Sequence, residues 1–303
     1  MSLSPPRWTH EELTEGAIRG LEIFREHRRG EAREDYTSHF EEARDAVENL
    51  LEATDDLADM LESGREAAAG YSGLEAFRYL SAPPLSTDDL ISLSEVTGNK
   101  LLSEAGWPSV ATVIFDTIDA HRFPWVREGR GPSNEERSIA IIATSALIAS
   151  RRVMTARANE AKKAQEALVM NALGNAGFTL VLPRKIASLH GAPQPGEYCG
   201  ESELGGSKAD VIARLPDFRT LAIECKASNS AVNSYKRVNH EAANKAKNWI
   251  QKFGTEEIVP AAVIGGVFDP KALAKAQTLG LTLWWSHDIE QMIDWIESLP
   301  ASR

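Results

Sequence analysis

The chain has 303 residues, 43% of them hydrophobic, which is enough material for one large domain or two ordinary ones with a substantial core. Its formal charge of −11 by itself argues against a nucleic-acid-binding protein. The sequence contains no run of 18 apolar residues, so no membrane-spanning helix is predicted. No secretory signal is expected, because no basic stretch followed by an apolar one opens the sequence. The two cysteines, Cys199 and Cys225, stand in no metal-binding spacing, so we expect a reducing cytoplasm.

The first half of the chain is predicted to be helical. Apolar residues recur at helical spacing over 9–29 and 34–62, and Gly30 and Gly64 supply breaks after these stretches. A further helix is predicted over 108–121.

A long helix is predicted to lead into the second half. Ser133 and Glu136 have the spacing of a capping box, in which each side chain bonds the backbone N–H of the other residue. The residues that follow are apolar, become basic at Arg151 and Arg152, and continue or kink towards Leu173. This pattern predicts one helix that changes from apolar to basic along its length.

The second half alternates between strands and helices, which is typical of an α/β fold. Strands are predicted over 178–182, 209–214, 220–227, 258–264 and 281–285. Helices are predicted over 234–253, 270–279 and 287–298. Residues 183–208 are predicted to be one long loop. The sequence therefore predicts a helical N-terminal region, residues 1–150, and an α/β domain, residues 151–303.

The charge is distributed unevenly between these regions. Residues 1–150 hold 14 Lys and Arg against 28 Asp and Glu, whereas residues 151–255 hold 16 against 9. An anionic partner would be attracted to the second segment, although this difference alone favours nucleic acid only weakly. The acidic N-terminal region is a candidate for embracing DNA, for dimerisation or for docking a partner.

Three charged residues stand on strands that otherwise look like core. Because side chains alternate along a strand, Glu224 and Lys226 are expected on one face, with Leu221, Ile223 and Cys225 on the other. A neighbouring strand can bring Asp210 alongside Glu224. The sequence therefore predicts two carboxylates and an ammonium at one edge of a sheet.

That set of groups suits metal-assisted cleavage of a phosphodiester. Asp210 and Glu224 offer hard oxygen ligands for Mg²⁺, and the main-chain carbonyl of Cys225 is a further candidate ligand. The Lys226 ammonium can orient the attacking water and offset the negative charge of the transition state. The alternative is a plain salt-bridged strand end.

These residues resemble the motif of the PD-(D/E)XK nuclease superfamily, in which an Asp begins one strand and Glu-x-Lys ends the next. Asp210, Glu224 and Lys226 match the motif, while Ala209 replaces the usual Pro before the Asp. The stretch "EALVMNALGNAG" is similar to an upstream helix of that superfamily, which makes Glu166 an additional acidic residue near the metal. The resemblance implies a mixed sheet flanked by helices, with an all-α region before it. The alternative for Glu166 is a solvent-exposed charge on the helix with no role at the site.

The segment "ECKASNSAVNSYKRVNHEAANKA" resembles the XamI-type restriction endonucleases. Several short polar side chains and a Lys-Arg pair follow the motif lysine in the sequence. We expect them to hold a DNA phosphate beside the scissile bond. The candidate DNA-binding residues are Ser228, Asn229, Ser230, Asn233, Lys236, Arg237 and Asn239. The alternative is a capped loop with Ser234 as the N-cap of the next helix.

The resemblance implies a type II restriction endonuclease that cuts double-stranded DNA with Mg²⁺ and leaves 5′-phosphate ends. It also implies a homodimer, a partner DNA methyltransferase and the target GTCGAC, although no base-reading residue can be identified from the sequence. Two alternatives stay open. One is a nuclease of another defence or repair system that recognises a DNA structure or modification, and the other is a non-cleaving DNA-binding protein on the same fold.

Overall fold

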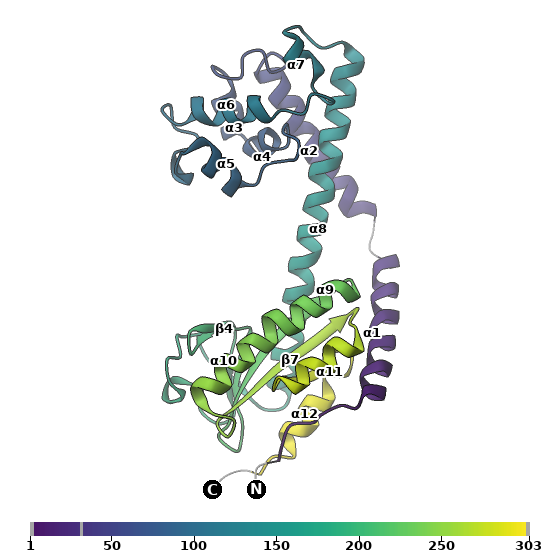
Figure 1. The fold of residues 1–303 in the computed structure, drawn as a ribbon, viewed down its shortest axis with the longest axis vertical. Helices are drawn as coiled ribbons and strands as arrows, with labels where there is room; N and C mark the ends of the chain where they lie inside the picture. Colours follow the sequence, from purple (N-terminus) through teal and green to yellow (C-terminus); the bar gives the residue numbers. More distant parts are fainter. Residues whose placement is uncertain (1–2, 31–32, 301–303) are drawn as a thin grey trace. The chain divides into compact units, whose positions relative to one another are not determined.

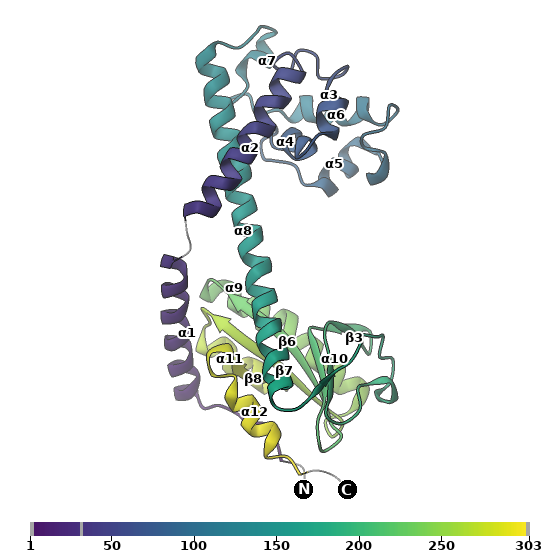
Figure 2. The same ribbon diagram turned by 180° about the vertical axis from the view of Figure 1, so that it is seen from behind.

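A computed structural model describes residues 3–30 and 33–300, which form two compact units (Figures 1 and 2). The helical unit comprises Ala32–Arg157, and the sheet unit comprises Met1–Glu31 together with Ala158–Arg303. Helix α8 (Asn134–Asn175) contributes its first part to the helical unit and its last part to the sheet unit. The predicted division near residue 150 therefore falls within a continuous helix.

The helical unit is built from two long helices, α2 (Arg33–Ala53) and the first part of α8, and several short ones around one apolar core. The short helices are α3 (Gly64–Ala69), α4 (Gly73–Arg78), α5 (Thr87–Ser94), α6 (Trp107–Thr117) and α7 (Pro124–Glu128). Phe77 and Trp107 pack edge to face at its centre, with ring centroids 5.2 Å apart. The helix predicted over 34–62 ends at Ala53, because the chain then turns through three consecutive residues with positive φ, Asp55 to Leu57.

The predicted capping box at the start of α8 is confirmed. The Ser133 amide donates to the Glu136 carboxylate at 2.8 Å, and the Glu136 amide donates to Ser133 Oγ at 3.2 Å. Arg130 also binds that carboxylate and lowers the pKa of Glu136 to about 2. One stretch of α8 is apolar enough to cross a membrane by composition, but Ala140 and Ile148 on this helix belong to the core of the helical unit, so α8 is a core helix.

The sheet unit contains a six-stranded mixed sheet in the order β1-β2-β5-β6-β7-β8. Its strands are β1 (Thr179–Leu180), β2 (Glu197–Cys199), β5 (Val211–Arg214), β6 (Thr220–Ser228), β7 (Ile258–Gly266) and β8 (Thr282–Trp285). Strand β6 pairs antiparallel with β5 and parallel with β7. The central position of β6 fixes the residues at its end between two neighbours.

The prediction of a single loop over 183–208 was wrong. This segment contains β2 and a separate hairpin formed by β3 (Ser202–Leu204) and β4 (Ser207–Ala209). These strands are three residues long, and β2 is held by pairing with β5. Strand β2 is short and paired through tertiary contacts, so its local sequence carries little strand signal. Strands β3 and β4 pair locally, and the two-residue turn Gly205–Gly206 between them was the available signal.

Helices cover both faces of the sheet. On one face, α8 and α12 (Glu290–Glu297) pack against the apolar residues of β6 and β7 (Figure 2). On the other face lie α1 (His10–Gly30), α10 (Ala243–Phe253) and α11 (Pro270–Thr278) (Figure 1). The short helix α9 (Ala231–Tyr235) and a π-helical segment, Lys236–Ala242, lead into α10. The predicted fold class, a mixed sheet flanked by helices with a helical N-terminal region, is confirmed.

Helix α1 packs on the sheet through its glycines, although the sequence grouped it with the N-terminal region. A Cβ at Gly16 would overlap the indole of Trp285, and one at Gly20 would lie 2.8 Å from the Gly266 carbonyl oxygen. Glycine costs about 1 kcal/mol relative to alanine inside a helix. Glycine is nevertheless needed at these two positions, because a residue with a side chain would not fit between the α1 backbone and strands β7 and β8.

Replacing Gly16 with alanine should therefore destabilise the protein, against the usual helix propensity. We expect a loss of about 1–3 kcal/mol in the free energy of unfolding, measured by urea denaturation, because the methyl group must displace a buried tryptophan. Gly174→Ala in α8 is the matched control, since its Cβ would meet only the Tyr198 hydroxyl at 3.4 Å. A Gly16→Ala variant as stable as the wild type would mean that α1 does not pack in this way.

Candidate active site

Asp210 stands at the bend where the chain leaves the β3–β4 hairpin and enters the sheet. Its amide donates to the carbonyl of Ile223, the register partner of Val211, at 3.0 Å, which anchors Asp210 to β6 just before β5 begins. Its carboxylate Oδ2 then accepts the N–H of Cys225 at 2.8 Å. The side chain thereby takes the place of a missing strand partner and is held rigidly against β6.

Glu224 and Lys226 lie on the same face of β6, as the alternation predicts, while Ile223 and Cys225 belong to the core on the opposite face. Glu224 is fully buried, and its Oε2 lies 2.7 Å from Lys226 Nζ. Lys226 Nζ is also 4.0 Å from Oδ2 of Asp210. The structure thus brings the three predicted side chains together.

Electrostatics favour the charged form of the motif lysine. Burial lowers the pKa of Lys226, but the carboxylates of Glu224 and Asp210 outweigh it, so the net pKa lies above its ordinary value. The side chain is only 14% exposed and has little freedom to leave. Lys226 is therefore a fixed positive charge beside two carboxylates.

Two further lysines enter the site from outside the motif, and sequence reasoning missed both. Lys245 on α10 places its Nζ 2.8 Å from Glu224 Oε1 and 2.7 Å from the Lys208 carbonyl oxygen. Its reach across the sheet face depends on how α10 packs, so no sequence signal could have found it. Lys162 on α8 lies 3.5 Å from Asp210 Oδ1.

Glu166 joins this cluster through Lys162. The Lys162 ammonium lies 3.3 Å from Glu166 Oε1 and 3.4 Å from Oε2 of Glu201, which comes from the segment before β3. The four-residue spacing of Lys162 and Glu166 on one helix was the available signal for this pair. The neighbouring Gln165 donates to the Val263 carbonyl at 3.0 Å and so anchors α8 against the sheet beside the site.

The predicted DNA-binding residues divide by exposure. Asn229, Asn233 and Lys236 are exposed, and Ser230 is partly exposed. Arg237 is partly exposed but donates to the Ala227 carbonyl at 2.6 Å, which ties the π-helical segment to the end of β6.

The other two predicted DNA-binding residues lie in the interior. Ser228 is buried and donates to the Ser230 carbonyl, and Asn239 is buried and donates to the Ala272 carbonyl at 3.0 Å. The suggested cap, Ser234, is also buried, and the N-cap of α9 is Ser230, whose Oγ accepts the Asn233 amide. The helix thus begins before the expected position.

The donors near the motif are hard oxygen atoms. Burial, together with Asp210 and Glu166, raises the pKa of the Cys225 thiol, so only the main-chain carbonyl of this residue is a candidate ligand. Within residues 3–30 and 33–300, no group of three or more His, Cys, Asp or Glu side chains is placed to hold a metal ion. Two carboxylates and a carbonyl suit Mg²⁺, because this ion keeps several water ligands and takes few from the protein.

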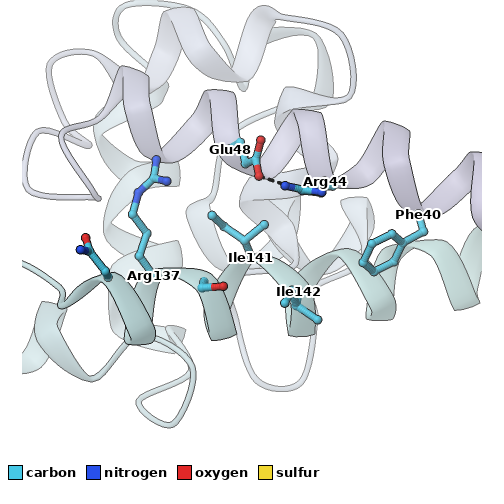
Figure 3. Close-up of a pocket in the computed structure, with 8 residues that line it drawn as sticks. Phe40, Arg44, Glu48, Arg137, Ile141 and Ile142 are labelled. Atoms are coloured by element: carbon cyan, nitrogen blue, oxygen red, sulfur yellow. Dashed lines mark hydrogen bonds and ion pairs between the residues drawn. The ribbon is translucent and has the colours of Figure 1, made fainter.

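An open groove in the helical unit offers no comparable chemistry. Its volume is about 460 Å³, and it lies between α2 and α8 (Figure 3). Arg44 on its wall is already paired with Glu48 at 2.8 Å, one turn along the same helix. The groove therefore lacks the clustered carboxylates found at the end of β6.

Comparisons with known proteins identify the family of this chain. A family model described as XamI restriction endonuclease matches residues 60–285. The type II restriction enzyme XamI of Xanthomonas campestris pv. amaranthicola is 40% identical over 267 residues, which cover 86% of this chain and 97% of that enzyme. No solved structure matches the chain. The resemblance to the XamI-type restriction endonucleases is confirmed, and the chain belongs to the XamI restriction endonuclease family.

Proposed function

We propose that this protein is a type II restriction endonuclease that uses Mg²⁺ to hydrolyse phosphodiester bonds at a specific sequence in double-stranded DNA. Membership of the family carries the reaction class and the DNA substrate. The observation that carries the catalytic assignment is the convergence of Asp210, Glu224 and Lys226 at the end of β6. We expect 5′-phosphate and 3′-hydroxyl ends.

Asp210 and Glu224 would hold the ion, with the Cys225 carbonyl as a third oxygen ligand. The N–H and C=O of a strand residue point to the same side, and the Cys225 N–H bonds Asp210, so its carbonyl also faces that carboxylate. When bound, Mg²⁺ supplies Lewis-acid polarisation of the phosphoryl oxygen and a more acidic water.

The remaining groups act on the substrate and the attacking water. Lys226 donates hydrogen bonds that orient this water and stabilise the charge that develops on the phosphoryl oxygens. Glu166 assists through an outer-shell water or a second ion. Both roles fit their positions, since Lys226 Nζ lies 2.7 Å from Glu224 and 4.0 Å from Asp210, and Glu166 is linked to Asp210 through Lys162.

The exposed residues after β6 would hold the DNA backbone. Asn229 and Ser230 precede α9, Asn233 lies within it and Lys236 follows it, close in the chain to the end of the strand that carries Lys226. The helical unit holds 12 Lys and Arg against 22 Asp and Glu, so extensive phosphate contact by that unit is disfavoured. Its role in dimerisation, docking or enclosing DNA stays a prediction.

A homodimer and a partner methyltransferase complete the proposal. A palindromic target presents two equivalent strands, and a two-fold symmetric dimer presents one active site to each. A methyltransferase of the same system would protect host DNA at the target. The free, buried cysteines Cys199 and Cys225 suit the reducing cytoplasm where that DNA lies.

Plasmid cleavage tests the proposal directly. Incubating the purified protein with plasmid and Mg²⁺ should give discrete bands, and chelation with EDTA should stop the reaction, because the chemistry needs the ion. A smear would indicate a nuclease without sequence specificity. A mobility shift without cutting, with methylated and unmethylated DNA alike, would indicate a binding protein and contradict the assignment.

A further inference from the structure

The buried carboxylates of the site are already neutralised by ammonium groups. Glu224 is fully buried, and its two oxygens face Lys226 and Lys245 at 2.7 and 2.8 Å. Asp210 is 6% exposed, and its Oδ1 faces Lys162 at 3.5 Å. A buried carboxylate needs such a partner, because an uncompensated charge in the interior is costly.

The three lysines differ in their freedom to move. Lys226 is 14% exposed and extends from a central strand, whereas the side chains of Lys162 and Lys245 are 49% and 30% exposed and extend from helices. A lysine with a solvated head and a flexible stem can turn towards water at low cost. The ammonium groups of Lys162 and Lys245 can therefore move away from the carboxylates into solvent, whereas that of Lys226 cannot.

We propose that Lys162 and Lys245 are exchangeable counter-cations, which hold Asp210 and Glu224 in the metal-free protein and must be displaced when a divalent ion binds. The inference rests on the proposed metal-dependent function. A cation at these carboxylates would stand within a few ångströms of both ammonium groups, where like charges repel. Metal binding is thus an exchange in which the divalent ion replaces the two lysine ammonium groups. Each of these lysines therefore lowers the affinity for the metal ion.

The second contact of Lys245 offers a matched control. Lys245 bonds the Lys208 carbonyl of β4, and Lys252, farther along α10, bonds the Gly205 carbonyl of the same hairpin at 3.1 Å. Lys252 pairs with no carboxylate of the site in the part of the chain that the structure describes. Removing Lys252 deletes a comparable contact between the same helix and hairpin without changing the charge beside Glu224.

The test is a titration of the full-length protein with Mn²⁺, without DNA, following free Mn²⁺ by electron paramagnetic resonance. Lys245→Met and Lys162→Met should each bind Mn²⁺ about tenfold more tightly than the wild type, since one competing charge is removed. Lys252→Met should bind as the wild type does. Affinity that is unchanged or weaker in Lys245→Met and Lys162→Met overturns the inference.

Thermal unfolding gives a second readout and separates the two proposals. Without metal, Lys245→Met should melt below the wild type, because Glu224 loses a partner, and saturating Mn²⁺ should raise its melting temperature by more than it raises that of the wild type. Asp210→Asn is the reference for the site. If Asp210→Asn binds Mn²⁺ as the wild type does, or the wild type binds none, the metal-dependent function fails as well. If Asp210→Asn abolishes Mn²⁺ binding but the lysine variants do not tighten it, only the proposed exchange is overturned.

Discussion

Replacing Asp210 with asparagine should lower the rate of DNA cleavage by about 10³-fold or more while leaving the protein folded. The asparagine keeps the size of the side chain, and its carbonyl oxygen can still accept the Cys225 N–H that fixes the bend before β5. It removes the negative charge that would hold the ion. Single-turnover cleavage of a plasmid at saturating Mg²⁺ measures the effect, and circular dichroism checks the fold.

Glu203→Gln provides the matched control for this experiment. Glu203 lies on β3 of the neighbouring hairpin, is partly exposed and pairs with Lys185 at 3.0 Å. Its neutralisation changes the charge of the sheet unit by the same amount without touching the three-residue site, so normal cleavage is expected. A rate for Asp210→Asn within a few-fold of the wild type would remove Asp210 from the catalytic machinery.

The core of the site could be predicted because it depends on local rules. Alternation along β6 puts Glu224 and Lys226 on one face whatever surrounds the strand. A short turn between β5 and β6 makes the two strands antiparallel neighbours, which brings Asp210 next to Glu224. Neither inference needed knowledge of distant parts of the chain.

The features that could not be predicted depend on tertiary packing. Asn239 is polar and follows a Lys-Arg pair, so the sequence places it with DNA, yet the packing of α11 buries it. Lys245 reaches Glu224 only because α10 crosses that face of the sheet. The net charge of −11 was also misleading, since the acidic excess lies mainly in the helical unit and the site in the sheet unit.

Replacing Lys226 with methionine should separate metal binding from chemistry. The variant should lose cleavage by about 10³-fold, because no donor remains to orient the water and stabilise the phosphoryl oxygens. It should still fold, since Lys245 continues to pair with Glu224 at 2.8 Å and methionine fills the space of the lysine stem. Mn²⁺ should bind at least as tightly as to the wild type, because both carboxylates remain.

This combination of results distinguishes a charge that acts on the substrate from one that only holds the site together. A purely structural role for Lys226 would lower metal affinity together with the cleavage rate, whereas the proposed role lowers the rate and leaves metal affinity intact. Lys185→Met is the control, because Lys185 is exposed and pairs with Glu203 away from the site. Normal cleavage by Lys226→Met would contradict the proposed role, because the proposed chemistry requires this positive charge beside the two carboxylates.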